Sequence, residues 1–333
     1  MMCSYCTLFD SNYLAKGLAM YYSLLKHCNS FCLYIFAFDK KTEIVLKKMG
    51  LKNVVVVSLK DLEDEDLLAV KSSRTNAEYF WTCSSAAIWY CMKNFNIDIC
   101  TYVDADLFFF SDPSILLDEM GDDDVLITEH RYTSQYDFTS LTGIYCVQFM
   151  SFKNTTNGLS VLNWWRSECL KWCYDRFEDG KYGDQKYLDD WPTRFTGIHV
   201  LQHLGGGMAP WNMQQYEIKF KNNVITGREL VSQNEFLVVF FHFHYVNCKK
   251  KHILREFLLT HPDYLFPDTT RNIIYAKYLP VLKACYKLVK KIDPSIDGLG
   301  MKELNDSWWM IFKRLVKGFI TGNNYFAHWI DIS

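Results

Sequence analysis

The stretch TYVDADLFFFSDP, residues 101–113, places two aspartates one residue apart behind a run of β-branched and aromatic residues. A run of this composition predicts a buried strand, which we expect at residues 99–103. Asp104 and Asp106 then stand at the carboxyl end of that strand. Because open α/β sheets bind ligands outside the carboxyl ends of their strands, this stretch predicts a ligand site together with the fold.

The residues around this stretch alternate apolar runs with helical patterns, which is typical of a parallel sheet covered on both faces. Expected strands are residues 4–9, 31–38, 53–58, 124–128, 143–152, 197–202 and 236–242. Expected helices are residues 14–25, 42–49, 76–94, 159–178 and 185–191, followed by 252–266, 270–292 and 306–320. These patterns predict an α/β fold, with a Rossmann-like nucleotide-binding sheet in residues 1–248 and a C-terminal helical extension in residues 249–333.

The composition excludes several classes of protein. Hydrophobic residues make up 49% of the 333 residues and aromatic residues 17%, which is enough for a large core and argues against disorder. Lys and Arg number 36 against 38 for Asp and Glu, so the chain has no overall field to hold a polyanion. We therefore expect no nucleic-acid partner.

Cysteine usage indicates a reducing compartment, because most of the 12 cysteines lie inside apolar runs, as small hydrophobic residues do. Cys3 and Cys6 form a CxxC, but no second pair follows at metal-site spacing, so we expect packing there rather than zinc or redox chemistry. The first residues lack the basic and apolar regions of a signal peptide, and the longest apolar windows are far shorter than the roughly 20 residues of a membrane span. These features predict a cytoplasmic protein.

Three interpretations compete for the two aspartates. They could cap the turn that leads to Pro113 and contact no ligand. They could belong to a haloacid-type phosphatase, but Phe108 stands where that motif has a threonine, and the motif would follow the first strand. They could bind Mg²⁺ or Mn²⁺, which takes carboxylate oxygens together with diphosphate oxygens.

Residues 102–110 resemble the YxDxD segment of nucleotide-sugar glycosyltransferases of the GT-A fold, because both the strand before the aspartates and the aromatic run after them agree. The resemblance extends through most of the first 245 residues, and the whole chain is similar to bacterial enzymes that build capsule or lipopolysaccharide glycans, of the type of glycosyltransferase family eight. It implies a GT-A type Rossmann-like sheet, a Mn²⁺ or Mg²⁺ cofactor, a UDP-sugar donor and a glycan or lipid-linked acceptor.

The resemblance also implies roles for residues along the donor site. The segment TLFDSNYLAKGLAMYYSL looks like the family's first strand and helix, which would place Phe9, Asp10 and Tyr13 at the nucleoside. The helix before the DxD strand carries a basic residue that approaches the diphosphate, and Arg74 is the candidate here. Asp104, Ala105 and Asp106 would face the diphosphate, with the two aspartates on the metal.

Two further segments resemble the sugar side of such a site. GIYCVQFMSFKN departs from the usual FNxGxxxFxN pattern, with Cys146 in the Asn place and Gln148 in the Gly place, so Gln148 could supply an amide to the sugar. GDQKYLDDW looks like the DQxxLN turn of retaining members, which makes Asp184 and Gln185 the catalytic candidates. Asp184 could instead cap the helix that it opens.

A third metal ligand is expected, because two carboxylates and a diphosphate leave an octahedral site incomplete. FLVVFFHFHYV resembles a family strand that ends in HFxG, whose first histidine corresponds to His242. HLGGGMAPWN resembles a second signature and offers His203. We prefer His242, because an imidazole at the end of an apolar strand needs a polar partner.

The sequence therefore predicts a metal-dependent hexosyltransferase, with retention of configuration favoured over inversion. The alternatives are a sugar-phosphate nucleotidyltransferase, which would normally carry a glycine-rich basic loop after its first strand, and a non-catalytic binder on the same fold. The tail mixes basic and aromatic residues, which suits either a helix lying on an anionic membrane surface or one packed on the domain. These tail residues are Trp308, Trp309, Ile311, Phe312, Lys313, Arg314, Leu315, Val316, Lys317 and Phe319.

Overall fold

The computed structural model describes residues 2–244, 246–251, 254–260, 264–300, 302–303, 309, 313, 316 and 328–331. Its main sheet has seven strands: β1 (Cys3–Phe9), β2 (Phe31–Ala37), β3 (Val54–Ser58), β4 (Ile99–Val103), β6 (Val125–Glu129), β7 (Tyr145–Lys153) and β8 (Ile198–Val200). The strand order is β3-β2-β1-β4-β7-β6-β8. The first four strands are parallel to one another, and β7 runs antiparallel to both of its neighbours.

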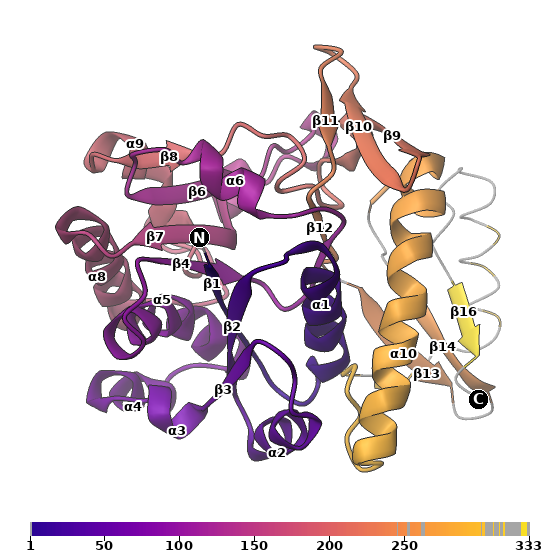
Figure 1. The fold of residues 1–333 in the computed structure, drawn as a ribbon, viewed down its shortest axis with the longest axis horizontal. Helices are drawn as coiled ribbons and strands as arrows, with labels where there is room; N and C mark the ends of the chain where they lie inside the picture. The colour runs from indigo at the N-terminus through magenta and orange to yellow at the C-terminus, as the bar shows by residue number, and fades with distance from the viewer. Residues whose placement is uncertain are drawn as a thin grey trace.

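Helices cover both faces of the sheet (Figure 1). One core lies under α3 (Leu59–Leu62), α4 (Glu65–Lys71), α5 (Asn76–Asn94), α8 (Thr156–Lys171) and α9 (Trp191–Arg194). The other lies under α1 (Leu14–His27), α2 (Lys40–Met49), α6 (Ser114–Glu119) and α10 (Ala276–Ile292). This arrangement confirms the predicted α/β sheet and leaves the carboxyl ends of the first four strands on one edge.

Local signals explain where the helices begin and end. Thr75 opens α5 with a capping box, in which its side chain accepts from the Glu78 amide and the Glu78 carboxylate accepts from the Thr75 amide. Asp39 caps α2 by accepting from the Thr42 amide, and Gly50 ends it in the left-handed conformation. The predicted helix at 76–94 and the predicted strand at 99–103 are confirmed at both ends.

Two predicted helices differ from the observed elements. The helix expected at 159–178 is α8, which ends at Lys171 because Trp172 is extended. The Tyr187 hydroxyl donates to the Glu168 and Trp172 carbonyls, so a side chain from another segment replaces the next helical turn. The helix expected at 185–191 is a 3₁₀ turn, η2 (Lys186–Asp190), that continues into α9.

The strand predicted at 236–242 is two strands. β11 (Glu235–Leu237) pairs with β10 (Val224–Glu229), which forms a hairpin with β9 (Tyr216–Lys221). β12 (Phe240–His242) leaves that sheet and pairs with β5 (Leu107–Phe109). The hairpin was not predicted, although Asn222 and Asn223 between two alternating runs are its sequence signal, and both have positive φ.

The prediction of a helix at 252–266 is wrong. Residues 254–260 form β14 (Leu254–Thr260), which pairs antiparallel with β13 (Asn247–Lys251). β15 (Lys302–Glu303) and β16 (His328–Asp331) complete this four-stranded sheet, in the order β15-β13-β14-β16. Pairing with distant strands has therefore overridden the local helical pattern.

The helix predicted at 270–292 is confirmed as η4 (Thr270–Tyr275) and α10, and α10 packs along α1 (Figure 1). The basic and aromatic tail lies outside the described residues except for Trp309, Lys313 and Val316, so its membrane contact stays a prediction, as does the domain boundary after residue 248. Within the described part of the chain, every helix is too short or too polar to cross a bilayer.

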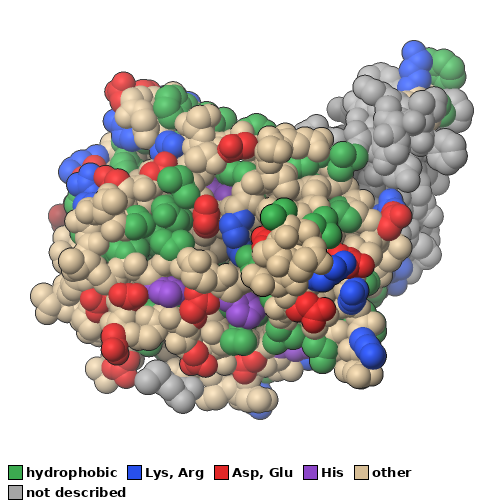
Figure 2. All heavy atoms as spheres, turned by 90° about the horizontal axis from the view of Figure 1, so that it is seen from above, with side chains coloured by type: hydrophobic (Ala, Val, Ile, Leu, Met, Phe, Trp, Pro, Cys, Tyr) green, Lys and Arg blue, Asp and Glu red, His purple; other side chains and the backbone are tan. Residues whose placement is uncertain are grey.

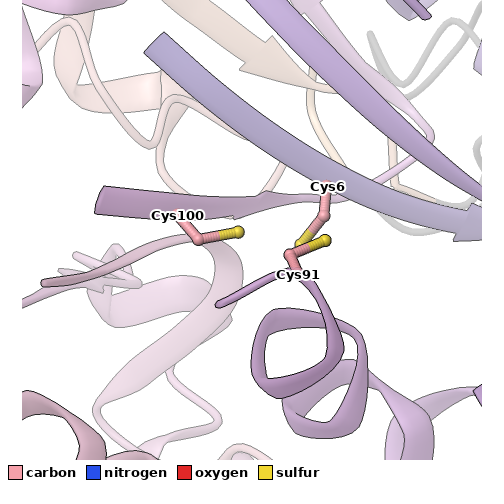
Figure 3. Close-up of side chains that lie close together, drawn as sticks. All are labelled: Cys6, Cys91 and Cys100. Carbon is pink, nitrogen blue, oxygen red and sulfur yellow. The ribbon is translucent and has the colours of Figure 1, made fainter. Parts of the chain in front are cut away.

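The CxxC pair is split by strand geometry, because residues three apart in a strand face opposite sides of a sheet. Cys6 joins the core under α5, and Cys3 packs against the core under α1. Figure 3 shows the side chains of Cys6, Cys91 and Cys100 converging from two strands and one helix. Their sulfur atoms lie within 4.8 Å of one another, and all three residues are fully buried.

The glycine-rich HLGGG segment lies against the link between β11 and β12. The amides of Val239 and Phe240 both donate to the Gly205 carbonyl, at 2.9 and 3.2 Å. A Cβ atom on Gly205 would lie 1.8 Å from the Leu237 carbonyl oxygen, which is backbone and cannot rotate away. Gly205 is therefore required for the loop to hold β12 in place.

Gly205→Ala should destabilise the protein by more than about 2 kcal/mol, because the new methyl group forces two backbone segments apart. Gly121→Ala is the matched control: its Cβ would meet open space, and its left-handed φ costs only about 1 kcal/mol. Urea unfolding of both variants measures the difference. Equal losses of stability would show that the loop adapts to a side chain at Gly205.

Candidate metal and donor site

The two aspartates stand on a tight turn between β4 and β5. The Asp104 amide donates to the Gln148 carbonyl of β7 at 3.0 Å, and the Leu107 amide donates to the Asp104 carbonyl at 3.2 Å. Asp106 is buried, at 7% exposure, and Asp104 is half-buried. Ala105 packs into the core between them. The turn therefore aims both carboxylates at one small volume.

His242 joins the aspartates through the pairing of β12 with β5, in which it lies opposite Leu107. Its Nε2 atom lies 3.1 Å from Asp106 Oδ1 and 3.7 Å from Asp104 Oδ2. Its Nδ1 atom lies 2.9 Å from Gln148 Oε1, an acceptor that holds the hydrogen on Nδ1 and leaves Nε2 facing the carboxylates. Gln148 thus orients His242.

The buried charges of the cluster act on one another. Burial raises the pKa of Asp104 to about 6, a shift that His242 opposes and Asp106 increases. Burial acts in the same direction on Asp106, but His242 and Lys16 outweigh it and hold the pKa of this carboxyl below its usual value. Two carboxylates in so little water favour a bound positive charge.

The three side chains suit a divalent cation. Their ligand atoms lie within 4.8 Å of one another, and two carboxylates with one imidazole match the oxygen-rich donor sets of Mn²⁺ and Mg²⁺. The Nε2 atom of His242 already points at the carboxylates. Asp104, Asp106 and His242 could therefore hold such an ion.

Asp184 lies beside this cluster, on a buried turn whose backbone carbonyl accepts from the Trp165 indole at 2.9 Å. Burial, followed by the charge of Asp104, raises the pKa of Asp184 to about 8. Its Oδ2 atom is buried and has no hydrogen-bond partner among the described residues. A buried polar atom without a partner is costly, so Asp184 is available to a ligand.

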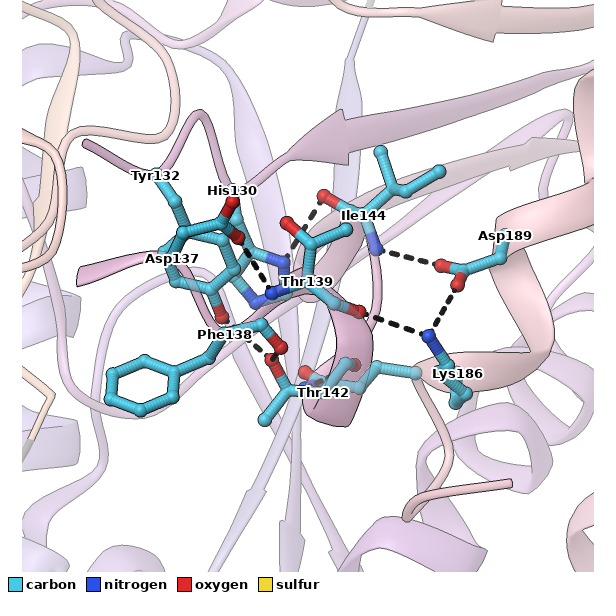
Figure 4. A network of polar contacts seen from close by, with 10 residues as sticks. His130, Tyr132, Asp137, Phe138, Thr139, Thr142, Ile144, Lys186 and Asp189 are labelled. Carbon is cyan, nitrogen blue, oxygen red and sulfur yellow. Dashed lines mark hydrogen bonds and ion pairs between the residues drawn. The ribbon is translucent and has the colours of Figure 1, made fainter. Parts of the chain in front are cut away.

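Gln185 points away from the aspartates. Its amide donates to the Thr142 carbonyl at the end of α7 (Thr139–Thr142), at 2.9 Å. Figure 4 shows how its neighbours anchor the same loop. Lys186 donates to the Thr139 carbonyl at 2.9 Å, and Asp189 accepts from the Ile144 amide at 2.7 Å. The DQ turn therefore places Asp184 near the cluster of Asp104, Asp106 and His242, and Gln185 takes part in anchoring the loop at Thr142.

The residues expected at the nucleoside have different environments. The Phe9 side chain is buried in the core, against Gly17 of α1. Asp10 accepts from the Asn12 amide and shapes the turn after β1. The Tyr13 side chain is partly exposed, and the charges of both aspartates act on its hydroxyl. The charge of the cluster therefore reaches Tyr13, whereas Asp10 makes its hydrogen bonds within its own turn and Phe9 lies in the core. The contact of these three residues with a nucleoside stays a prediction.

Lys16 is a buried basic residue that the sequence analysis missed. It is only 4% exposed, and its Nζ atom lies 4.1 Å from the centroid of the Tyr13 ring. Its charge is among those that lower the pKa of Asp106 as described above. The sequence signal for Lys16 was its spacing from Tyr13, which was already a candidate. Lys16 lies three residues after Tyr13, and residues three apart share one face of a helix.

Arg74 makes its contacts at the end of α8. Its guanidinium donates to the Leu170 carbonyl at 3.3 Å and stacks over the Tyr174 ring, at 3.9 Å from the ring centroid. These partners fix Arg74 where it closes the last turn of α8. Its approach to a diphosphate stays a prediction.

His203 lies apart from the aspartates and makes a different set of contacts. Its amide donates to Glu119 at 2.9 Å, and its Nδ1 atom accepts from the Gly205 amide at 3.2 Å. Glu119 also pairs with His199 at 2.8 Å. Acidic side chains and histidines lie next to one another on the face of the molecule shown in Figure 2. Of the two histidines considered, His242 is the one that joins the aspartates.

An aromatic wall borders the cluster and was not predicted as part of it. The Trp211 ring lies 5.5 Å from both His242 and His244, and its indole donates to the His130 carbonyl at 2.9 Å. The His130 ring stacks on Tyr132 at 4.6 Å. The APWN string therefore serves to position Trp211 beside the cluster.

The buried His130 should make stability depend on pH. Burial lowers the pKa of His130 to about 3, whereas an unfolded histidine titrates near about 6.5, so the unfolded chain binds an extra proton between these values. The neutral, buried His130 therefore contributes fully to the stability of the folded protein above about pH 6.5. As the pH falls toward 3, the free energy of unfolding decreases by about 1.4 kcal/mol per pH unit. In His130→Phe, the unfolding free energy should change less steeply with pH between about pH 4 and 6. The expected difference in slope is about 1.4 kcal/mol per pH unit, which corresponds to one proton. Equal slopes in urea titrations would contradict this assignment.

Comparisons with known proteins agree with this fold. The architecture is similar to that of the galactosyltransferase LgtC, solved in complex with donor and acceptor sugar analogues, at a TM-score of 0.51 and 12% identity over 84% of this chain and 95% of LgtC. It is also similar to the apo form of the glycosyltransferase GlyE of Streptococcus pneumoniae TIGR4, at a TM-score of 0.50 and 11% identity. That match covers 98% of this chain, which spans 65% of the GlyE chain. The chain has the GT-A fold.

Sequence comparison gives closer relatives. No family model matches the chain. The uncharacterized protein YfnF of Bacillus subtilis strain 168 is 28% identical over 316 residues, which cover 92% of this chain and all of YfnF. The uncharacterized protein YfnD of the same strain is 30% identical over 281 residues, 83% of this chain and 88% of YfnD. The chain therefore belongs to the same protein family as YfnD of Bacillus subtilis.

Proposed function

We propose that this protein is a metal-dependent glycosyltransferase that moves a hexose from a UDP-sugar to a glycan or lipid-linked acceptor. The observation that carries the proposal is the cluster of Asp104, Asp106 and His242 at the carboxyl end of β4, on a fold shared with glycosyltransferases. Mn²⁺ or Mg²⁺ bound there would supply positive charge to the diphosphate of the donor and of the departing nucleotide.

The chain's own residues would orient the donor around this cluster. Asp10 and the partly exposed Tyr13 follow the carboxyl end of β1, where they would receive the nucleoside. Gln148 holds the His242 tautomer through its oxygen, and its amide nitrogen is buried without a partner among the described residues, which leaves it free for a sugar hydroxyl. This arrangement supports the donor lying from β1 across to β7.

Asp184 would bind the transferred sugar or the acceptor on the far side of Asp104. Its buried, unpartnered Oδ2 atom supports this role. In the transfer, the bond between sugar C1 and the β-phosphate oxygen breaks and its electron pair stays on the diphosphate. The acceptor oxygen bonds to C1, and its proton passes to the departing diphosphate. We propose retention at C1, on the resemblance of the DQ turn to retaining enzymes.

A panel of nucleotide sugars tests the function. Each sugar is offered with Mn²⁺, and release of the nucleoside diphosphate is measured with and without EDTA. One sugar should be hydrolysed or transferred in a metal-dependent way. Production of pyrophosphate from a nucleoside triphosphate and a sugar phosphate would instead identify a nucleotidyltransferase, and binding without turnover would identify a non-catalytic binder.

Asp104→Asn and Asp106→Asn should each abolish transfer and weaken Mn²⁺-supported UDP binding by more than about tenfold, because each removes a charge from the cation site. The fold should survive, since neither carboxylate packs in the apolar core. Calorimetry with UDP and Mn²⁺ measures the affinity. Asp118→Asn is the control, because Asp118 is an exposed acid of α6. Unchanged UDP affinity in both site variants would remove the aspartates from the metal site.

His242→Ala and His203→Ala should separate the two histidines. Loss of the His242 imidazole should weaken metal-supported UDP binding by about tenfold or more, because a ligand and its link to Gln148 are both lost. His203→Ala should leave that affinity within about twofold of the wild type, since His203 contacts Glu119 and Gly205 instead. The same calorimetric titration serves both variants, and the reverse result would make His203 the ligand.

A further inference from the structure

Three cysteine side chains meet on the face of the main sheet that α5 covers. Cys6 of β1 and Cys100 of β4 lie on neighbouring parallel strands, offset by two residues, because Ser4 pairs with Cys100 and Cys6 pairs with Tyr102. Both cysteines belong to the core under α5, so their side chains share one face of the sheet, and Cys91 reaches them from α5 (Figure 3). The strand register and the helix position therefore bring together three sulfur atoms from distant parts of the sequence.

The spacing of these sulfur atoms is close to that of the ligands of one metal ion. Every pair of sulfur atoms lies within 4.8 Å. Three sulfur atoms that each lie about 2.3 Å from a central ion are separated from one another by about 4 Å. Because the three side chains come from two strands and a helix, the backbone already holds them on three sides of a common centre. The geometry of the trio therefore fits a three-sulfur site.

The surroundings of the three thiols suit a soft ion. Cys6, Cys91 and Cys100 have no exposed surface, and apolar and aromatic side chains of the core under α5 enclose them. Soft ions prefer thiolate ligands, whereas Mg²⁺ and Mn²⁺ prefer carboxylate oxygens and water. Asp104 begins the oxygen-rich cluster four residues beyond Cys100, about 13 Å further along an extended strand. The two ends of β4 would therefore select ions of different chemistry.

The number and charge of the ligands indicate which soft ion fits. Structural zinc almost always takes four ligands, and the described part of the chain offers no fourth cysteine, histidine or carboxylate within the same 4.8 Å. Copper(I) can take three sulfur ligands and is among the ions that thiolates select. An uncompensated charge is costly in an apolar core. One thiolate neutralises a monovalent ion, whereas a divalent ion needs two, so Cu(I) is the ion that this core accepts at the lowest cost.

We propose that Cys6, Cys91 and Cys100 form a binding site for Cu(I), which ties β1, β4 and α5 together. When the ion binds, one thiol becomes a thiolate and releases its proton to the solvent, and the copper stays Cu(I), so no electron is transferred. Because the ion binds the folded chain, it should raise the melting temperature. The site shares no ligand with the aspartate and histidine cluster, so it does not depend on the proposed glycosyltransferase function.

Copper loading of the full chain tests this site. The reduced protein is incubated without oxygen with the Cu(I)–bicinchoninate complex, both as the folded chain over several hours and during refolding from urea, because a fully buried site exchanges slowly. Copper retained after desalting gives the stoichiometry, competition with bicinchoninate gives the affinity, and X-ray absorption identifies the neighbours of the ion in the wild type. Cys6→Ala, Cys91→Ala and Cys100→Ala each remove one ligand. Cys83→Ala is the matched control, because Cys83 is another fully buried cysteine of α5.

The wild type should retain about one copper ion per chain, with sulfur neighbours at about 2.3 Å, and excess Mn²⁺ should not displace it. Each ligand variant that melts as a folded protein should bind Cu(I) at least about tenfold more weakly, and Cys83→Ala should match the wild type. Three results would each overturn the site: no retained copper after either loading procedure, oxygen or nitrogen neighbours in place of sulfur, or equal affinity in the ligand variants and the control. The three thiols would then serve only to pack the core.

Discussion

The pairing of β5 with β12 is the interaction on which the candidate site depends. It joins Leu107, Phe108 and Phe109 to a strand from far along the chain and sets His242 opposite Leu107. The Phe243 amide closes the pairing by donating to the Asp106 carbonyl at 2.9 Å. Because strand side chains alternate, a slip of one residue would turn His242 away from the aspartates. The Gly205 loop and the aromatic core behind β12 fix this register.

This register concentrates charges that conflict in the absence of a ligand. Asp104 and Asp106 repel one another, Lys16 is buried, and Asp184 presents an unpartnered oxygen. Folding alone gains nothing from such an arrangement, since apolar side chains of similar volume would pack there at lower cost. Local conflicts of this kind in an otherwise consistent core are characteristic of functional sites. In the proposed function, the metal, the diphosphate and the sugar hydroxyls are the groups that would resolve them.

The sequence was sufficient for the parts of this arrangement that depend on neighbouring residues. The strand at 99–103, the helix at 76–94 with its capping box, and the two aspartates at the strand tip all follow from local pattern. His242 could be selected over His203 because an imidazole at the end of an apolar strand needs a polar partner. By contrast, residues 254–260 have a helical pattern and form a strand, which pairs with β16 from far along the chain as well as with the neighbouring β13.

The residues that the sequence did not reveal are those that reach the site across the fold. Lys16 and Trp211 face the cluster only because α1 packs on β5 and the APWN loop packs on His130. The sequence likewise did not reveal that the Gln185 amide donates to the Thr142 carbonyl and helps to anchor that loop, and its catalytic role stays a prediction. Lys186 and Asp189 fasten that loop as well (Figure 4). The cluster is thus encoded in short strand ends, whereas the loop at Thr142 is held by exchangeable polar contacts. A chain could therefore change that loop while the cluster at β4 stays intact.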